Sequence, residues 1–262
     1  MTQPLTTGRA LLETELRAAV EAAKAAGDRV LQMRQDGLRY GRKEGFELVS
    51  EADLVAAEML HAALTGAFPD TGWLSEEHAD DSDRVQRERV WIVDPIDGTR
   101  EYLQGIPEYA VSVALAVNGR PALGVVYNPA RDQMHAAVCV GVVERESRLI
   151  PGKFEVLVGR GEKRMHEVPS LPRDARTRGV GSVAYRLARL AEGDAHAVVT
   201  GSGRMEWDVA AGAALCLAAG LRTTDVLGGE IRLNQPDPYV RGLLVAAPPL
   251  HLHLREHFDR HY

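Results

Sequence analysis

The stretch W-I-V-D-P-I-D-G-T, residues 91–99, restricts the fold of this chain more than any other. An apolar run of β-formers ends at Asp94, and Pro95 then turns the chain because proline lacks an N–H and has a fixed φ. Asp97 follows two residues after the proline, so both carboxylates lie at one sharp corner. Two unit negative charges about 4 Å apart repel by roughly 4 kcal/mol at an effective dielectric near 20. The corner therefore predicts a positively charged ligand between the two aspartates.

Helix-like and strand-like segments surround this corner in the first half of the chain. Residues 10–35 have apolar side chains at helical spacing, and a second helix is expected after Ser50, which precedes Asp53 by three positions as in a capping box. Turn signals such as N-G-R-P separate segments rich in β-branched and apolar residues. These segments predict consecutive sheet strands at 90–94, 109–117, 122–129 and 133–140.

The pattern restarts near residue 140, which predicts a second α/β half. We expect the first half to span residues 1–140 and contain the D-P-I-D-G-T motif, and the second to span residues 141–262. Within the second half, residues 168–179 are predicted as a proline-punctuated link and residues 221–233 as a hairpin. The other predicted elements are strands at 153–159 and 195–201 and helices at 182–193 and 206–220.

Composition excludes several classes of protein. A net charge of −6 argues against binding to a nucleic acid polymer. Nowhere do 18 apolar residues run together, and the N-terminus lacks the pattern of a signal peptide, so we expect a cytoplasmic protein that does not span a membrane. The two cysteines, Cys139 and Cys216, are far apart and predict neither a disulfide framework nor a zinc site.

Other carboxylates stand where they could join the corner. Glu76 and Glu77 end a short predicted strand, Asp208 begins a predicted helix, and Asp53 belongs to the capping box. Each alone is most often a surface charge or a helix cap. Considered together, they could converge on divalent ions, and oxygen ligands near a phosphate favour Mg²⁺ or Mn²⁺ over zinc. A helix beginning at Thr99 would present N–H groups to such a phosphate.

The D-P-I-D-G-T motif and the Trp207–Asp208 pair, in this order over roughly residues 10–250, resemble the inositol monophosphatase superfamily of Mg²⁺-dependent, lithium-sensitive phosphatases. The resemblance implies an α/β fold, a layered αβαβα sandwich of the sugar-phosphatase type, with the active site between two halves. It implies two or three Mg²⁺ ions, with Mn²⁺ as a substitute. The implied metal ligands are Glu76, Asp94, Asp97, Asp208 and the carbonyl of Ile96. Asp53 and Thr99 would orient the attacking water, and the backbone of Gly98 and Thr99 would contact the phosphate.

Within this superfamily, the chain is more similar to the 3'(2'),5'-bisphosphate nucleotidases of CysQ type than to the inositol enzymes. Arg100 and Glu101 after D-G-T carry that similarity. The inositol enzymes generally have a glutamate seven residues before the aspartate of the tryptophan motif, and here that position is Gly201. The expected reaction is Mg²⁺-dependent hydrolysis of the 3'-phosphate of adenosine 3',5'-bisphosphate. The implied or candidate substrate contacts are Gly181, Ser182, Glu206 and Arg100.

Two alternatives stay open at this point. One is an inositol-1-monophosphatase or a broad sugar phosphatase of the same fold. The other is a catalytically silent relative that binds a metal or ligand for regulation, although a pure binder could dispense with Asp53 and Thr99, which are both present. The expected partner is a small phosphorylated metabolite, and the sequence leaves a homodimer open. The C-terminal histidines, His251, His253, His257 and His261, fit a solvated terminal helix better than a metal site.

Overall fold

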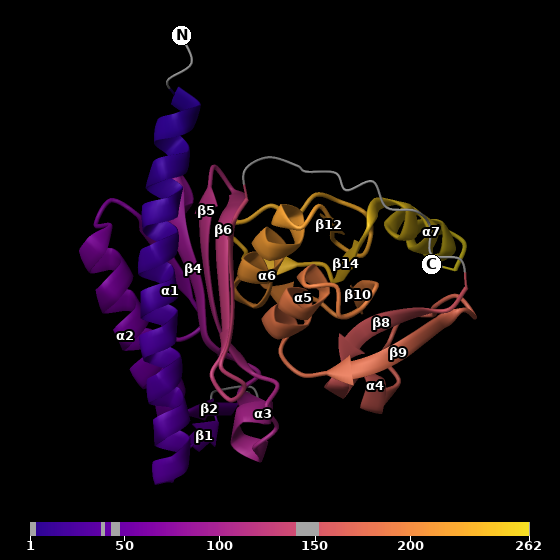
Figure 1. The fold of residues 1–262 in the computed structure, drawn as a ribbon, viewed down its shortest axis with the longest axis horizontal. Helices are drawn as coiled ribbons and strands as arrows, with labels where there is room; N and C mark the ends of the chain where they lie inside the picture. Colours follow the sequence, from indigo (N-terminus) through magenta and orange to yellow (C-terminus); the bar gives the residue numbers. More distant parts are fainter. Residues whose placement is uncertain (1–3, 38–39, 43–47, 140–151, 262) are drawn as a thin grey trace.

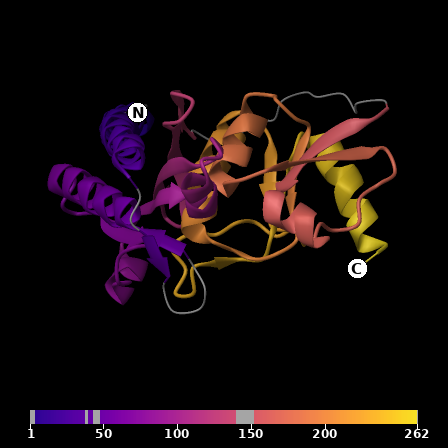
Figure 2. The ribbon, with the colours of Figure 1, turned by 90° about the horizontal axis from the view of Figure 1, so that it is seen from below.

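The computed structural model of the chain describes residues 4–37, 40–42, 48–139 and 152–261. Helices and sheets alternate in five layers, seen in Figure 1 and, from below, in Figure 2. Helices α1 (Pro4–Asp36) and α2 (Glu51–Ala67) form the first layer, and α7 (Pro248–Asp259) lies at the opposite end of the molecule. The expected αβαβα sandwich is confirmed.

The first sheet contains the D-P-I-D-G-T corner. Its strand order is β3-β4-β5-β6-β7, with β3 parallel to β4 and the other pairs antiparallel. Asn118 and Gly119 join β5 to β6, both with positive φ, as a two-residue hairpin turn requires. The strands are β3 (Gly72–Ser75), β4 (Arg89–Asp97), β5 (Ala110–Val117), β6 (Arg120–Asn128) and β7 (Gln133–Val138).

One prediction about this sheet was wrong in detail. Strand β4 does not stop at Asp94 but continues to Asp97. The pairing with β5 shifts between these two residues, since Asp94 pairs with Ser112 and Asp97 with Ala110. Pro95 lies inside this bulge, where the missing N–H interrupts the ladder without ending the strand. The corner is therefore a bulged strand end.

The second sheet has the order β12-β14-β10-β8-β9, with β10, β8 and β9 parallel and the remaining pairs antiparallel. Residues 168–179 were predicted as a link, yet the last part of that range belongs to the polar edge strand β9. Residues 221–233 do not form the predicted hairpin, because β12 pairs with β14 and a single bridge joins Thr224 to Glu230. The strands are β8 (Phe154–Gly159), β9 (Ala175–Val180), β10 (Ala197–Thr200), β12 (Arg222–Thr224) and β14 (Leu243–Ala246).

Short elements complete the described chain. The predicted helix after the corner is α3 (Thr99–Gln104). The predicted boundary between residues 140 and 141 lies outside the described residues, so the division into two halves stays a prediction. The other short elements are α4 (Arg160–Met165), the 3₁₀ helix η1 (Ser82–Gln86) and two small sheets that pair β1 (Tyr40–Arg42) with β2 (Leu48–Ser50) and β11 (Arg204–Met205) with β13 (Tyr239–Val240).

The middle layer holds the two sheets together. It consists of α5 (Val183–Ala191) and α6 (Glu206–Ala218), which lie between the sheets in Figure 1. Glycine permits the close packing, since a Cβ on Gly124 of β6 would lie 2.2 Å from the carbonyl oxygen of Ala211 in α6. One apolar cluster includes residues of both sheets and both helices. Helix α6 therefore packs closely against the first sheet.

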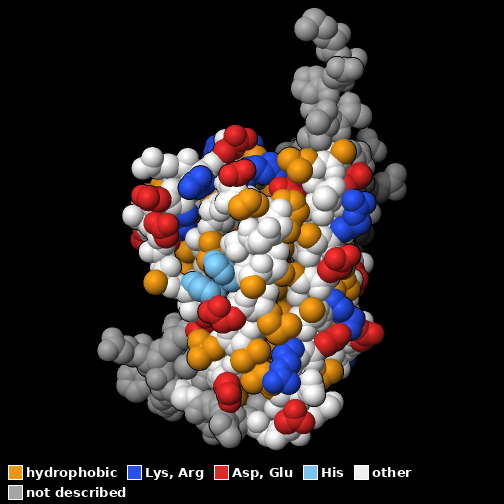
Figure 3. Space-filling model, turned by 90° about the vertical axis from the view of Figure 1, so that its left-hand side faces the viewer, with side chains coloured by type: hydrophobic (Ala, Val, Ile, Leu, Met, Phe, Trp, Pro, Cys, Tyr) orange, Lys and Arg blue, Asp and Glu red, His pale blue; other side chains and the backbone are white. Residues whose placement is uncertain are grey.

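The outer face over α1 and α2 has both charge signs interspersed with apolar side chains, as Figure 3 shows. Among the described residues, no helix combines the length and the apolar character that crossing a bilayer requires.

Candidate active site

Strand β4 delivers both aspartates of the corner to a buried position. Asp94 is 2% exposed and accepts a hydrogen bond from the backbone N–H of Ile96 at 2.9 Å. Asp97 is 7% exposed. The chain then turns into α3 at Gly98, whose φ of +94° favours glycine and whose Cβ would lie 3.2 Å from the carbonyl oxygen of Glu108.

Asp208 reaches the same place from the other half of the chain. It lies in the first turn of α6, where the backbone N–H of Met205 donates to its carboxylate at 3.3 Å. Ser112 of β5, the neighbour of Asp94 across the sheet, donates to the carbonyl oxygen of Trp207 at 3.2 Å. This bond ties the start of α6 to the strand beside the corner.

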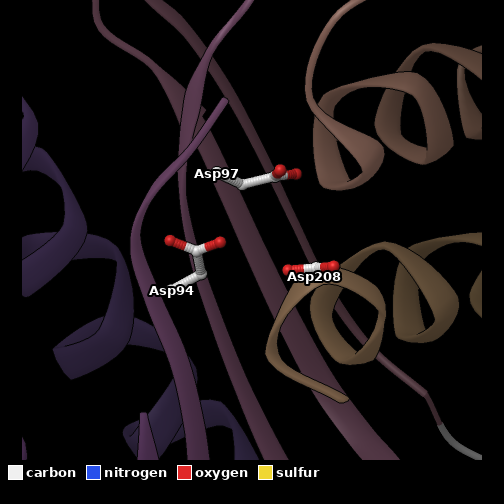
Figure 4. A group of neighbouring side chains, drawn as sticks. All are labelled: Asp94, Asp97 and Asp208. Carbon is white, nitrogen blue, oxygen red and sulfur yellow. The ribbon is translucent and has the colours of Figure 1, made fainter. Parts of the chain in front are cut away.

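The carboxylates of Asp94, Asp97 and Asp208 meet between β4 and α6, as Figure 4 shows. One oxygen atom from each lies within 4.8 Å of the others. Their side chains border a cavity of about 480 Å³. The sequence-predicted residues that line it are Glu76, Asp94, Ile96, Asp97, Gly98, Thr99, Arg100, Gly181, Ser182 and Asp208.

The electrostatics of this cluster fit a divalent cation. Burial raises the pKa of Asp94, and the carboxylates of Glu76 and Asp97 raise it further. The pKa of Asp208 is raised by burial and then by the charges of Asp97 and Glu76. Burial also raises the pKa of Asp97, against the hydrogen bonds it accepts. Mg²⁺ and Mn²⁺ prefer carboxylate oxygens as ligands, and a bound cation would offset the repulsion among these three side chains.

Ser182 orients Asp97 from the second half. Its hydroxyl donates to Asp97 Oδ2 at 2.7 Å, and the backbone N–H of Ala184 donates to the same oxygen at 2.5 Å. Ser182 also caps α5 by accepting from the N–H of Tyr185 at 3.0 Å. The side chain of Ser182 therefore caps α5 and contacts Asp97 at the same time. Its neighbour Gly181 has no room for a side chain, since a Cβ would lie 2.5 Å from Cγ of Glu101.

Asp53 combines helix capping with contact to the site. Its Oδ2 accepts from the N–H and the hydroxyl of Ser50 at 2.7 and 2.6 Å, while Oδ1 lies 2.9 Å from the hydroxyl of Thr99. The Thr99 hydroxyl also lies 3.0 Å from the carbonyl oxygen of Ile96. Because this hydroxyl has a single proton, it can donate to one of the two oxygens at a time.

Glu206 lies outside the cavity, although the sequence suggested it as a substrate contact. It is 1% exposed, and its two carboxylate oxygens accept from the backbone N–H groups of Asn234 at 2.6 Å and Gln235 at 2.9 Å. Asn234 in turn accepts from the buried guanidinium of Arg84 at 2.9 Å. The geometry gives Glu206 a role in fixing a loop and does not support a contact with substrate.

Sequence reasoning missed the basic part of the cavity. Arg160, Glu162, Arg186 and Arg204 line it together with the predicted Arg100. The available signal was weak, because single arginines in a helix such as residues 182–193 are most often surface residues. Arg186 is instead 2% exposed.

Comparisons with known proteins agree with this geometry. The model of the "Inositol monophosphatase family" matches residues 11–261. An inositol-1-monophosphatase of Mesorhizobium japonicum is 32% identical over 240 residues, covering 86% of this chain and 89% of that protein. A 3'-phosphoadenosine 5'-phosphate phosphatase of Mycobacterium leprae is 31% identical over 246 residues, covering 87% of each chain. The crystal structure of the extragenic suppressor protein suhB from Bartonella henselae superposes with a TM-score of 0.75 at 26% identity, covering 92% of this chain and 96% of that one.

Proposed function

The chain belongs to the inositol monophosphatase family of metal-dependent phosphomonoesterases, and within it we propose that the substrate is adenosine 3',5'-bisphosphate. Water attacks the 3'-phosphorus, the bond from phosphorus to the 3' oxygen breaks, and the products are adenosine 5'-monophosphate and inorganic phosphate. The observation that carries this proposal is the set of four arginines, Arg100, Arg160, Arg186 and Arg204, that line the same cavity as the acidic cluster. A substrate with two phosphate groups matches a cavity that offers both a metal site and several guanidinium groups.

The proposal assigns the metal site to residues that line the cavity. Glu76, Asp94, Asp97, Asp208 and the carbonyl of Ile96 would hold two or three Mg²⁺ ions, for which Mn²⁺ could substitute. Such ions lower the pKa of bound water and neutralise charge on phosphate oxygens. Asp53 and Thr99 hold the attacking water in place through their shared hydrogen bond. The backbone of Gly98 and Thr99 contacts the reacting phosphate.

The substrate contacts come from both halves of the chain. Arg100 follows the phosphate-binding turn, is exposed and lines the cavity. Gly181 and Ser182 line the same cavity, and Ser182 acts on substrate through Asp97. Glu206 is not one of the proposed substrate contacts, since both of its carboxylate oxygens accept hydrogen bonds from the backbone of residues 234–235.

The position of Gly201 supports a nucleotide over an inositol phosphate. It stands seven residues before Asp208, where the resemblance leads one to expect a glutamate in inositol enzymes. A Cβ at Gly201 would lie 2.7 Å from Cγ of Pro169, and the residue does not border the acidic cavity. No side chain from this position can accept hydrogen bonds from sugar hydroxyls in the cavity.

A second candidate is inositol-1-monophosphatase activity, favoured by the 32% identity to the Mesorhizobium enzyme. The two functions separate in one experiment, in which phosphate release with Mg²⁺ is measured from adenosine 3',5'-bisphosphate, inositol 1-phosphate and a hexose phosphate. We expect the highest kcat/KM on the bisphosphate, and inhibition of that activity by Li⁺. Equal or better turnover of inositol 1-phosphate rejects the nucleotide assignment, and no turnover of any substrate by metal-loaded protein identifies a silent relative.

A further inference from the structure

We propose that Arg204 binds the second phosphate group of the substrate, and that it does so by exchanging its ion pair with Glu162 for the incoming phosphate. This inference rests on the proposed function, because it requires a substrate with two phosphates. It assigns a specificity-determining role to a residue of the short strand β11 that precedes the metal-site helix α6.

Glu162, the ion-pair partner of Arg204, also accepts hydrogen bonds from other groups. Glu162 is 5% exposed, and its Oε1 lies 3.2 Å from a terminal nitrogen of Arg204. The same carboxylate accepts from the hydroxyl of Ser202 and from the backbone N–H of Gly159, each at 2.8 Å. Glu162 therefore keeps two hydrogen bonds when the guanidinium of Arg204 turns to a ligand.

The N–H groups of the Arg204 guanidinium are only partly hydrogen-bonded within the described part of the chain. A terminal nitrogen donates to the carbonyl oxygen of Gly203 at 3.2 Å, which is a long bond. Its Nε is buried and has no hydrogen-bond partner among the described residues. Buried polar groups in folded proteins are nearly always paired, so a movement of the Arg204 guanidinium toward a ligand would let this N–H gain a partner that it lacks now. Guanidinium donors match phosphate oxygens in geometry and charge.

A second arginine, Arg186, lies beside Glu162 and can balance its negative charge when Arg204 turns away. Arg186 is 2% exposed, and its Nε also lacks a partner in the described part of the chain. A Cβ added to Gly159 would lie within 3 Å of both Arg186 and Glu162, so these two side chains lie close together. Two guanidinium groups therefore lie near the one carboxylate of Glu162, and Arg186 also interacts with the charges of Asp97 and Glu101. Arg186 stays beside Glu162 when the guanidinium of Arg204 turns to a phosphate group.

Arg204 and the acidic cluster face the same space. Arg204 and Asp208 line one cavity of about 480 Å³. A molecule that places one phosphate at the acidic cluster can therefore present another to Arg204 within this cavity. A monophosphate substrate cannot occupy both places.

The test compares kcat/KM for adenosine 3',5'-bisphosphate and adenosine 3'-monophosphate in the wild type and in Arg204→Gln. We expect the ratio of the two kcat/KM values to fall about a hundredfold in the variant, mainly through KM for the bisphosphate. Arg204→Lys should retain part of the ratio as a point charge. Adenosine 5'-monophosphate, which carries the second phosphate alone, should become a weaker competitive inhibitor of Arg204→Gln. The matched control is Arg189→Gln, which removes an arginine of similar exposure, 22% against 23%, paired with Asp194 outside the cavity.

Each outcome decides between the proposals. A variant that loses equally on both substrates shows that Arg204 acts on the reacting phosphate or on the fold, and overturns the inference. An unchanged ratio, or unchanged inhibition by adenosine 5'-monophosphate, overturns it as well. A wild-type enzyme with no preference for the bisphosphate rejects the proposed function itself, whatever the variants do. Thermal unfolding of each variant identifies a loss that comes from misfolding.

Discussion

Glu206 and Asp208 are two carboxylates of one helical turn, and their surroundings differ completely. Glu206 is 1% exposed and both of its oxygens accept backbone N–H groups at hydrogen-bonding distance. Asp208 accepts a long bond of 3.3 Å and faces other carboxylates across the cavity. The first arrangement gives both carboxylate oxygens donors from the protein, although burial still raises the pKa of Glu206 to about 7, and the second suits a bound cation. The donors that the protein supplies, more than burial, distinguish Glu206 from the candidate metal ligand Asp208.

The largest expected effect is the loss of activity when Asp208 is replaced, which should far exceed the loss when Glu206 is replaced. Asp208→Asn should lower kcat by about 10³-fold or more, because it removes a charged ligand from the metal site. The same change should raise the thermal stability of the metal-free protein, since it relieves repulsion from Asp97 and Glu76. Steady-state kinetics and calorimetry in EDTA measure the two effects. A variant that loses activity and stability together would contradict the assignment of Asp208.

The stabilisation of the protein by Mg²⁺ should depend on Asp208 and not on Glu206. Saturation to about a hundred times Kd should stabilise the wild type by about 2.7 kcal/mol, because the ion binds the folded state. Asp208→Asn should show a much smaller shift, whereas Glu206→Gln should keep the full one. The measurement is the unfolding midpoint across a Mg²⁺ titration. Equal shifts in both variants would place the ion elsewhere.

Glu206→Gln should mainly affect stability. The amide of glutamine can accept only one of the two N–H groups, from Asn234 or Gln235, and brings an N–H of its own against the other. We expect a loss of about 2 kcal/mol in the free energy of unfolding. Turnover by the folded fraction should fall less than tenfold, which urea denaturation and active-site titration test together. A thousandfold loss of kcat with full stability would show that Glu206 acts in the active site after all.

The smallest effect concerns a buried group far from both carboxylates. His251 of α7 is 2% exposed, with Nε2 2.8 Å from the hydroxyl of Thr224, and burial lowers its pKa to about 4. The unfolded histidine, with a pKa near 6.5, binds more protons than the folded one between these values. Its contribution is therefore complete above pH 6.5 and decreases as the pH falls toward 4, by about 1.4 kcal/mol at pH 5.5.

Replacing the imidazole provides the control for that pH dependence. His251→Gln should remove this part of the acid sensitivity while it leaves the Mg²⁺-induced stabilisation unchanged. Unfolding curves at pH 7.5 and pH 5.5, with and without the ion, measure both quantities. If the variant and the wild type lose the same stability at low pH, the acid sensitivity originates in other groups.

The sequence predicted the local secondary structure and the helix cap around the site well. The β-rich run before Asp94, the capping pair Ser50 and Asp53, and the helix after Gly98 all depend on residues within a few positions of one another. The polar edge strand β9 was missed because its arginines and neighbouring prolines give no alternating apolar pattern. Its identity as a strand comes from parallel pairing with β8.

By itself the sequence determined which groups could bind a metal, since carboxylates after a strand and at a helix start are readable in the chain. Only the tertiary structure decided which of them meet. Ser182 contacts Asp97 across 85 positions, and Glu206 is withdrawn from the site by a loop 28 residues away. Short-range patterns set backbone conformation, whereas contacts of this span depend on how whole layers pack. The pairing of Arg204 with Glu162 in the cavity wall belongs to the second kind.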